Sequence, residues 1–349
     1  MKVLSLFSGI GAFEKALDNL GIDYELVGFS EIDKYAVKSY CAIHGVDESM
    51  NLGDITKIDE KALPKDIDFI TYGFPCQDIS LEGKQKGLFN EDGTQTRSGL
   101  FFEALRLIED TKPRIAIAEN VKNLTSKKFA EQFKIILDSL EEAGYNNYWK
   151  VLNAKDYGIP QNRERVFIVS IRKDVDNGLF EFPKPIKTQK IQDFLEKEVD
   201  EENLISDYFL QQIKETKFKR DRHKKNTFAL ANGEIEGFKI MDYRYDEGLR
   251  IRENNLCPTL TTRGSQSISG VPIIYNNKSL RFIIPLECWR LMGFDDEDFE
   301  KAAPVNSNTQ LYKQAGNSIV VNVLEMLLKN VEPYLTTTTD CKETEGKIE

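Results

Sequence analysis

The strongest constraint on the fold is an alternation of short apolar runs with amphipathic stretches over roughly the first 170 residues. Several of the runs are almost wholly apolar, which is typical of strands covered on both faces, and the stretches between them have apolar residues at helical spacing. This pattern predicts an α/β fold built on a doubly wound, mostly parallel sheet. The expected strands are Val3–Phe7, Glu25–Ser30, Ile67–Phe74, Arg114–Glu119, Tyr148–Asn153 and Arg165–Ile171, and the expected helices are Phe13–Leu20, Asp33–His44, Gly99–Asp110 and Lys128–Ala143.

A second, irregular region follows this pattern. Pro183 and Pro185 interrupt the alternation, and regular structure returns only at Pro285–Phe294 and Asn317–Asn330. We therefore expect a main domain made of residues 1–178 and 310–335 and a smaller, loop-rich domain at residues 179–309. The polar end, residues 336–349, is expected to be disordered.

Composition excludes several classes of protein. The 47 basic and 57 acidic residues give a net charge of −10, which argues against indiscriminate binding to nucleic acid. Five cysteines without a C-x-x-C pair argue against a disulfide framework and a structural zinc site, and two histidines supply a metal site poorly. No run reaches the roughly 18 apolar residues of a membrane-spanning helix, and the start does not resemble a signal peptide. We expect a cytoplasmic protein that needs no metal.

Candidate binding residues occur in successive βα units, where an open α/β sheet binds ligands. Ser8-Gly9-Ile10-Gly11 comes directly after the first strand, Glu31 ends the second, and Asp54 follows in the next connection. An acidic residue about 20 positions after the glycines suits ribose hydroxyls, and Asp54 suits an adenine amino group. A tight turn explains the glycines alone, and a helix cap explains either acid alone. Together the three indicate a site for a nucleotide-like ligand.

Reactive side chains are expected at the same edge. Cys76 follows the third strand in GFPCQDIS, and Glu119 ends the next strand, where burial would raise its pKa and retain a proton near neutrality. Arg163 and Arg165 begin a later strand with the alternate spacing that puts both on one side. Each residue also has an ordinary structural explanation: a buried thiol, a helix-cap network and structural ion pairs.

These segments, taken in order, resemble a known family. FSGIG, the strand-end Glu31, GDIT, GFPCQDIS, ENV, QNRERVF, PLECWRLMGF and QAGNSIVVNVLEML resemble the ordered motifs of the bacterial and phage DNA cytosine carbon-5 methyltransferases. The resemblance covers residues 1 to about 172 and about 258 to 330, while the segment between them varies in this family. Two positions depart from it: Ala12 replaces a usual glycine and Ile79 a common aromatic. Alanine is small enough that we expect cofactor binding to be retained, and Ile79 is expected to alter the packing of its loop slightly.

The resemblance implies a Rossmann-like methyltransferase fold with a target-recognition domain at 179–309, and it implies a reaction. Cys76 would add to carbon-6 of a cytosine and thereby make carbon-5 nucleophilic. A protonated Glu119 would bind ring nitrogen-3 and the exocyclic amine. Arg163 and Arg165 would hold the cytosine carbonyl oxygen, Glu119 and nearby phosphate. The base that removes the carbon-5 proton is not indicated, and a water molecule is plausible.

The implied methyl donor is S-adenosylmethionine, which leaves as S-adenosylhomocysteine. Phe7 would lie near its sulfonium, Ile32 would cover one adenine face, and the last helix would return to complete the pocket. The residues that the resemblance assigns to this site are Phe7, Ser8, Gly9, Ile10, Gly11, Glu31, Ile32, Asp54, Ile55, Pro75, Leu100, Asn317 and Ser318.

The implied substrate is double-stranded DNA with the target base swung out of the helix. The glycine-containing loop from Ser80 to Gly99 is suited to close over it, and the basic run from Lys217 to Lys225 is suited to phosphates, although each also fits an ordinary surface segment. The expected DNA-binding residues are Gln77, Ser80, Lys84, Lys86, Thr259, Leu260 and Arg263. We expect a monomer, and a cognate restriction endonuclease, if one exists, would act separately.

Three alternatives remain open at this stage. A relative that methylates transfer RNA shares the chemistry, although Gln77 after Pro-Cys favours DNA. A non-catalytic DNA-binding protein shares the fold, but the presence of Cys76, Glu119 and both arginines argues against it. A nicotinamide-dependent dehydrogenase shares the sheet but would carry G-x-G-x-x-G, which is absent.

Overall fold

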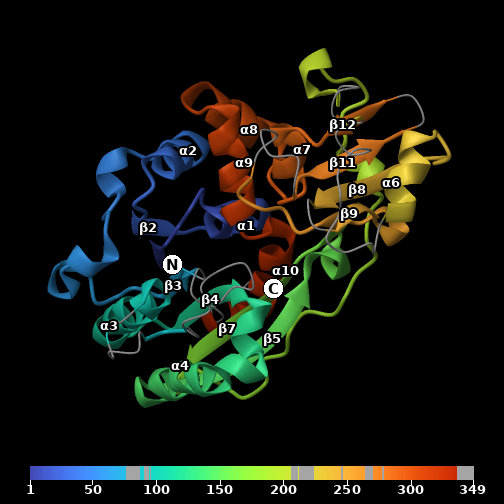
Figure 1. Cartoon of the computed structure of the whole chain (residues 1–349). Helices are drawn as coiled ribbons and strands as arrows, with labels where there is room; N and C mark the ends of the chain where they lie inside the picture. Colours follow the sequence, from blue (N-terminus) through green and yellow to red (C-terminus); the bar gives the residue numbers. More distant parts are fainter. Residues whose placement is uncertain are drawn as a thin grey trace, which may run out of the picture.

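The structure is a computed structural model that describes residues 1–75, 87–89, 94, 96–205, 211, 224–244, 247–263, 270–276 and 279–335. Its centre is a six-stranded sheet with the order β2-β1-β3-β4-β7-β5 (Figure 1). The strands are β1 (Lys2–Leu6), β2 (Glu25–Ser30), β3 (Phe69–Tyr72), β4 (Ile115–Val121), β5 (Tyr145–Asn153) and β7 (Glu164–Arg172). All six expected strands are confirmed, with ends that shift by up to three residues.

One strand of this sheet runs against the others. Pairing is parallel from β2 through β1 and β3 to β4, but β7 is antiparallel to both β4 and β5. The sheet is therefore mostly parallel, as expected. Because β7 runs in the opposite direction, it begins at the edge of the sheet where β1, β3 and β4 end. Val121 of β4 pairs with Arg165 of β7 at that edge.

Helices cover both faces of the large sheet. Alternate strand residues divide between two buried clusters, as period-2 strands require. One cluster joins Val3, Phe69 and Ile117 to α1 (Ala12–Leu20) and α10 (Val321–Leu335). The other joins Leu4, Ile70 and Ala116 to α3 (Phe101–Thr111) and α4 (Ala130–Glu142). The sheet is thus doubly wound, with two helical layers.

Local signals fix where the helices begin and end. Asp33 accepts a hydrogen bond from the Tyr35 amide at 3.0 Å and so caps α2 (Lys34–His44). Gly21 and Gly45 end α1 and α2 in the left-handed conformation that glycine adopts readily. The chain then passes from α1 into β2, and from α2 toward β3. The four helices expected between the strands are all present.

A smaller antiparallel sheet, drawn in yellow and orange in Figure 1, stands beside the main body. Its order is β12-β11-β8-β9, and Ile235, Met241, Tyr243, Leu249 and Ile273 form its own buried cluster. Helix α6 (Lys224–Ala231) covers that cluster. The strands are β8 (Lys239–Arg244), β9 (Gly248–Ile251), β11 (Pro272–Tyr275) and β12 (Leu280–Phe282), while β6 (Gln161–Asn162) pairs separately with β10 (Cys257–Pro258).

The helices that precede α10 pack on the main body, and α7 also contacts the small sheet through the Arg281–Glu287 ion pair. They are α7 (Pro285–Arg290), α8 (Asp296–Ala302) and α9 (Asn308–Asn317). Trp289 is fully buried in the same cluster as Phe13 and Leu17 of α1. The division expected at residue 309 stays a prediction. Because these helices pack on the main body, we propose that residues 285–309 belong with the main domain.

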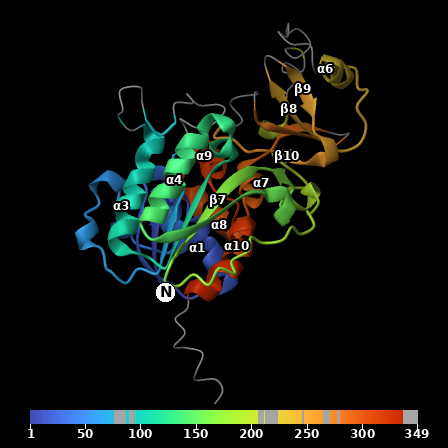
Figure 2. The same ribbon diagram turned by 90° about the horizontal axis from the view of Figure 1, so that it is seen from below.

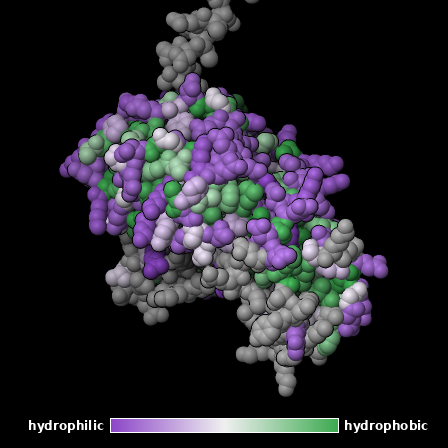
Figure 3. Space-filling model, turned by 90° about the horizontal axis from the view of Figure 1, so that it is seen from above, coloured by the Kyte–Doolittle hydropathy of each residue, from purple (hydrophilic) through white to green (hydrophobic). Residues whose placement is uncertain are grey.

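No helix among the described residues has the length and apolar character needed to cross a membrane. Hydrophilic side chains cover much of the face shown in Figure 3, with smaller apolar areas between them.

Candidate active site

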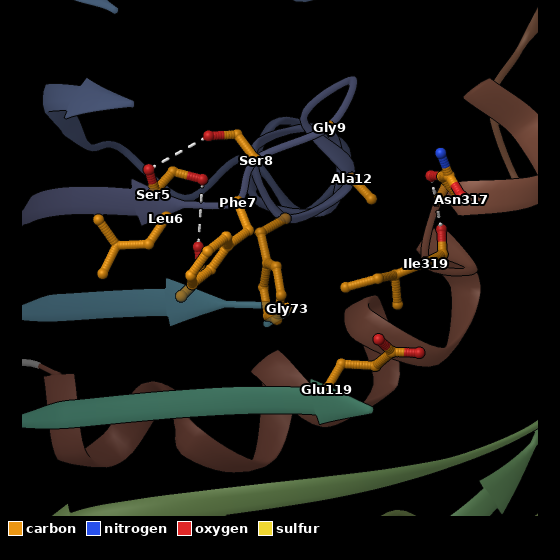
Figure 4. Close-up of a pocket in the computed structure, with 13 residues that line it drawn as sticks. Ser5, Leu6, Phe7, Ser8, Gly9, Ala12, Gly73, Glu119, Asn317 and Ile319 are labelled. Atoms are coloured by element: carbon orange, nitrogen blue, oxygen red, sulfur yellow. Dashed lines mark hydrogen bonds between the residues drawn. The ribbon is translucent and has the colours of Figure 1, made fainter. Parts of the chain in front are cut away.

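A cavity lies at the carboxyl edge of the large sheet, between the ends of β1, β3 and β4 and the connection from α9 to α10 (Figure 4). The strands turn into loops here, so main-chain groups and side chains from distant segments meet. The residues that line it are Ser5, Leu6, Phe7, Ser8, Gly9, Ala12, Phe13, Thr71, Gly73, Glu119, Asn317, Ser318 and Ile319. Five of the expected site residues other than Glu119 are among them: Phe7, Ser8, Gly9, Asn317 and Ser318.

The two glycines of the first turn have different surroundings. A Cβ placed on Gly9 would meet no atom within 4 Å, so this position borders open space in the cavity. A Cβ on Gly11 would lie 2.1 Å from Nε2 of His44, which also lies 3.2 Å from the Ile10 carbonyl oxygen. Both glycines have positive φ angles. Gly9 therefore leaves room for a ligand, while Gly11 lets the turn pack against α2.

Phe7 lies at the end of β1 with a φ of 53°, a left-handed conformation that is uncommon for an aromatic residue. Such backbone strain costs about 1–3 kcal/mol and tends to gather at functional sites. The Ser8 amide donates to the Ser30 carbonyl at 3.1 Å and holds the turn against the end of β2. The Phe7 ring is held at the cavity by this constrained turn (Figure 4).

Glu31 connects the glycine turn to the end of β2. Its Oε2 accepts from the Gly9 amide at 3.0 Å, and its Oε1 accepts from the Ile32 and Asp33 amides at 2.8 Å. The carboxylate therefore lies beside the cavity-lining turn. Beside it the apolar side chain of Ile32 is 79% exposed.

Asp54 begins a short 3-10 turn, Ile55–Lys57, and accepts from the Thr56 amide at 3.1 Å and from the Thr56 hydroxyl at 2.9 Å. The capping role that the sequence allowed is therefore present. These hydrogen bonds lower the pKa of Asp54, led by the one from the Thr56 hydroxyl, so the carboxylate stays ionised. Ile55 is buried, and Leu100 lies just before α3.

The far wall comes from the end of α9, which α2 holds in place. The Ser39 hydroxyl donates to Oε1 of Gln314 at 3.0 Å, and Nε2 of Gln314 donates to the Tyr35 carbonyl at 2.9 Å. Lys313 also pairs with Asp33 at 2.6 Å. These contacts hold the end of α9, with Asn317 and Ser318, against the cavity. The last helix, α10, packs on α1 of the first domain, and its role in completing the pocket stays a prediction.

Glu119 points into the cavity from the end of β4 (Figure 4). Its side chain is 12% exposed, and its Oε1 lies 2.9 Å from Nε of Arg165. Burial raises the pKa of Glu119 above its ordinary value of 4.5, although the charges of Arg165 and Arg163 oppose that effect. Desolvation is the larger influence, so the site favours a carboxyl group that keeps its proton to a higher pH than an exposed one.

The neighbouring asparagine joins this strand end to the segment that leads to Cys76. Nδ2 of Asn120 donates to the Phe74 carbonyl at 3.0 Å, and Asn120 is almost fully buried. A Cβ on Gly73 would come no closer than 3.9 Å to Oε2 of Glu119. Residues 73–75 therefore run beside the Glu119 carboxyl group. Sequence reasoning missed Gly73 and Asn120, although their places at two strand ends were a usable signal.

Arg163 and Arg165 differ in surroundings despite their alternate spacing. Arg165 contacts Glu119, whereas the buried Arg163 binds main chain. Its Nη1 donates to the Leu260 carbonyl at 3.1 Å, and its Nη2 donates to the carbonyls of Gly316 and Ser318 at 3.0 and 2.6 Å. Arg163 thus joins β7 to two segments far along the chain, while its charge still lowers the pKa of Glu119.

The described part of the chain includes some of the residues predicted to bind DNA. The Thr259 hydroxyl donates to the Asn162 carbonyl at 2.7 Å, and Arg263 is exposed. Leu260 is only 4% exposed and packs in the main core, so in this structure its side chain serves packing. Cys76, Gln77, Ser80, Lys84 and Lys86 lie outside the described residues, as does most of the basic run from Lys217 to Lys225.

A family model described as C-5 cytosine-specific DNA methylase matches residues 1–332. The chain belongs to this family. It is a DNA cytosine-5-methyltransferase, and the family that the motifs predicted is confirmed. The fold is that of an S-adenosylmethionine-dependent methyltransferase, which excludes the dehydrogenase alternative, and the match to DNA methylases argues against transfer RNA as the substrate.

Relatives of this cytosine-specific methylase are similar over nearly the whole chain. The orphan methyltransferase M.SPBetaI of Bacillus phage SPbeta is 33% identical, over 95% of this chain and 97% of that protein. The type II methyltransferase M.HhaI of Haemophilus parahaemolyticus is 34% identical, over 95% and 94%. The crystal structure of the S. pombe Dnmt2 methyltransferase has a TM-score of 0.66 at 22% identity, over 95% and 99%, which supports the fold.

Proposed function

We propose that this methyltransferase transfers a methyl group from S-adenosylmethionine to carbon-5 of a flipped-out cytosine within a short, specific sequence of double-stranded DNA. The observation that carries this proposal is the buried Glu119 carboxyl group, which faces the cavity beside the strand end that leads into Cys76. An acid with a raised pKa, beside a strand end that leads to a cysteine in the sequence, suits a reaction that activates a pyrimidine ring.

The residues at the cavity suit S-adenosylmethionine. The open space beside Gly9 admits a ligand, the exposed Ile32 offers an apolar face to an adenine, and Glu31 and Asp54 offer carboxylates to hydroxyl and amino groups. The Phe7 ring suits a cationic sulfur through a cation-π contact. When bound, S-adenosylmethionine supplies an electrophilic methyl group and leaves as S-adenosylhomocysteine.

Cys76 is proposed as the nucleophile. Its thiolate forms a bond to carbon-6, and the electron pair of the 5,6 double bond moves to carbon-5, which then takes the methyl carbon. A protonated Glu119 hydrogen bonds to ring nitrogen-3 and withdraws electron density from carbon-6 during the attack. Loss of the carbon-5 proton to a base, plausibly water, restores the double bond and expels the Cys76 thiolate. The cytosine ring is thereby regenerated with one added methyl group.

The arginines are proposed to position the reacting groups. Arg165 orients Glu119 through the 2.9 Å contact and can reach the cytosine carbonyl oxygen from the same edge. Arg163 fixes the main chain of residues 260, 316 and 318 around the cavity. Its assignment as a catalytic residue remains a prediction.

The cytosine must leave the helix, at a cost of a few kcal/mol, before it can reach Glu119. The segment from Ser80 to Gly99 is proposed to close over the base, and Gln77, Ser80, Lys84, Lys86, Thr259, Leu260 and Arg263 are proposed to contact DNA. We further propose that the protein acts as a monomer in the cytoplasm, at the nucleoid, either beside a restriction endonuclease or as an orphan phage enzyme.

The test is to incubate the purified chain with unmethylated genomic DNA and labelled S-adenosylmethionine, and then to sequence the product by bisulfite conversion. We expect carbon-5 methylation at one short DNA word and none with Cys76→Ser. Cys41→Ser, at a partly exposed position on α2, is the matched control and should stay active. Labelling of RNA alone would overturn the substrate, and cofactor binding without any labelling would support a non-catalytic protein.

A further inference from the structure

One face of the small sheet lies on the side opposite its own hydrophobic cluster. Met241 and Tyr243 of β8 pack in the cluster beneath α6, together with Leu249 of β9. Because strand side chains alternate, Asp242 and Arg244 lie on the opposite face. Arg250 of β9 pairs directly with Asp242 and lies on that face too.

A buried carboxylate organises this face. Asp242 is 2% exposed, and its Oδ2 accepts from both Nε, at 3.0 Å, and Nη2 of Arg250. Its Oδ1 accepts from Nε of Arg252 at 2.5 Å. One acid therefore holds two guanidinium groups, whose side chains remain 19% and 29% exposed. We call Arg244, Arg250 and Arg252, with Asp242 between them, the arginine face.

Arg252 binds Asp242 through Nε, and this hydrogen bond does not use the edge formed by its Nη1 and Nη2 groups. A guanidinium group is a planar fork, and its Nη1–Nη2 edge lies away from a partner bound at Nε. Arg250 uses its Nε–Nη2 edge for Asp242, and its Nη1 lies 3.7 Å from Glu247. Arg252 is therefore the better placed of the two for a second, bidentate partner.

Arginines are concentrated at this face. Four of them (Arg244, Arg250, Arg252 and Arg263) lie here, and among the side chains that the structure describes they stand beside two acids, Asp242 and Glu247. Arg263 belongs here because a Cβ on Gly270 would lie 3.7 Å from its Nη1, and the Gly270 amide donates to the Tyr243 carbonyl at the end of β8.

The arginine face is also connected to the active site. The segment that carries Arg263 is bound to the catalytic edge, because Thr259 donates to the Asn162 carbonyl and Arg163 donates to the Leu260 carbonyl. Figure 2 shows the small sheet extending past the carboxyl edge of the large sheet. DNA that presents a base to Glu119 would pass this sheet.

We propose that the arginine face reads the DNA sequence, with the Arg252 fork binding O6 and N7 of a guanine in the major groove. Asp242 is the positioning residue that fixes the fork, while Arg244 and Arg250 add positive charge toward the phosphates. This inference rests on the proposed sequence-specific methylation of DNA. The hydrogen bond from Nε to Asp242 does not occupy the Nη1–Nη2 edge of Arg252, and the side chain is 29% exposed, which suits a second partner.

The test begins with the DNA word found for the wild type. Duplexes carrying 7-deazaguanine in place of one guanine at a time lack the N7 acceptor. At one position we expect the wild-type kcat/KM to fall about 5- to 100-fold, in line with the usual discrimination by a bidentate arginine. Arg252→Met, which has no hydrogen-bond donor, should be slower on the natural word but almost indifferent to 7-deazaguanine at that position. Asp242→Asn should lose the same sensitivity.

Lys239→Gln is the matched control, because it removes a positive charge from the opposite face of β8, and it should retain the full sensitivity. Melting temperatures check that each variant is folded, and Arg252→Met still tests the contact if Asp242→Asn unfolds. Equal sensitivity of the wild type and Arg252→Met at every guanine would overturn the inference, as would a word without guanine. Absence of any wild-type methylation would instead refute the proposed function.

Discussion

At the scale of single residues, the site depends on how burial changes ordinary side chains. Glu119 is held by Arg165, which favours its ionised form, yet desolvation at the end of β4 has the larger influence on its pKa. The same environment keeps an acid protonated to higher pH and makes its ionised form unfavourable for folding. Burial of Glu119 therefore has two effects. It raises the pKa, which suits the proposed reaction, and it lowers the stability of the folded chain when Glu119 is ionised.

The raised pKa of Glu119 predicts a pH dependence of stability that Glu119→Gln removes. Below about pH 4.5 the carboxyl is protonated in both the folded and the unfolded chain, and above the raised pKa it is ionised in both. The free energy of unfolding of the wild type should therefore fall relative to Glu119→Gln as the pH rises from about 4.5 to the raised pKa. Urea unfolding across this range measures it. An opposite trend would mean that Arg165 outweighs burial.

Two neighbouring glycines should respond differently to the same substitution. Gly11→Ala places a methyl group against His44 at a φ of 80°, so we expect a loss of about 3 kcal/mol or more in unfolding free energy. Gly9→Ala meets no atom and should lose about 1–2 kcal/mol from its φ alone, but its methyl group enters the cavity and should weaken cofactor binding. Urea unfolding and cofactor titration separate the two effects. Equal destabilisation by both would contradict these assigned roles.

At the scale of elements, periodicity predicted the strands and helices of residues 1–172 because buried strands and amphipathic helices leave direct traces in a sequence. It could not give the direction of β7, since an alternating pattern reads the same both ways. It could not show that Arg163 binds the carbonyls of Leu260, Gly316 and Ser318, because such partners leave no trace in side-chain spacing. The strand-end position of Glu119 was predictable, but the bond from Asn120 to the Phe74 carbonyl was not.

The packing of α10 on α1 gives a prediction for a whole element. Leu327 is fully buried in the cluster that includes Leu17, so Leu327→Ala should lower the free energy of unfolding by about 2–5 kcal/mol. Lys329→Ala, on the exposed side of the same helix, is the control and should change it by less than about 0.5 kcal/mol. A single transition in far-UV and fluorescence signals is also expected. A separate early transition in Leu327→Ala would show that α10 folds independently.

At the scale of the whole molecule, one buried ion pair joins the small sheet to the main body. Arg281 of β12 donates from Nη1 and Nη2 to Glu287 of α7 at 2.9 and 2.6 Å, and both side chains are at most 5% exposed. The amides of Ile284 and Glu196 also donate to the Glu287 carboxylate. The continuous stretch from β12 to α7 and the distant segment at Glu196 therefore meet at one carboxylate, which we expect to help orient the small sheet.

Removing Arg281 alone should lower the free energy of unfolding more than removing both members of the ion pair. Arg281→Met leaves the Glu287 charge buried without its partner, and we expect a loss of about 3–5 kcal/mol in unfolding free energy. The double variant Arg281→Met/Glu287→Leu removes both charges and should recover much of that loss, although the amides of Glu196 and Ile284 lose an acceptor. Urea unfolding of the two single variants, the double variant and the wild type completes the cycle. If the double variant is as unstable as the sum of the single ones, the pair is not coupled, and the small sheet must be oriented by its apolar contacts instead.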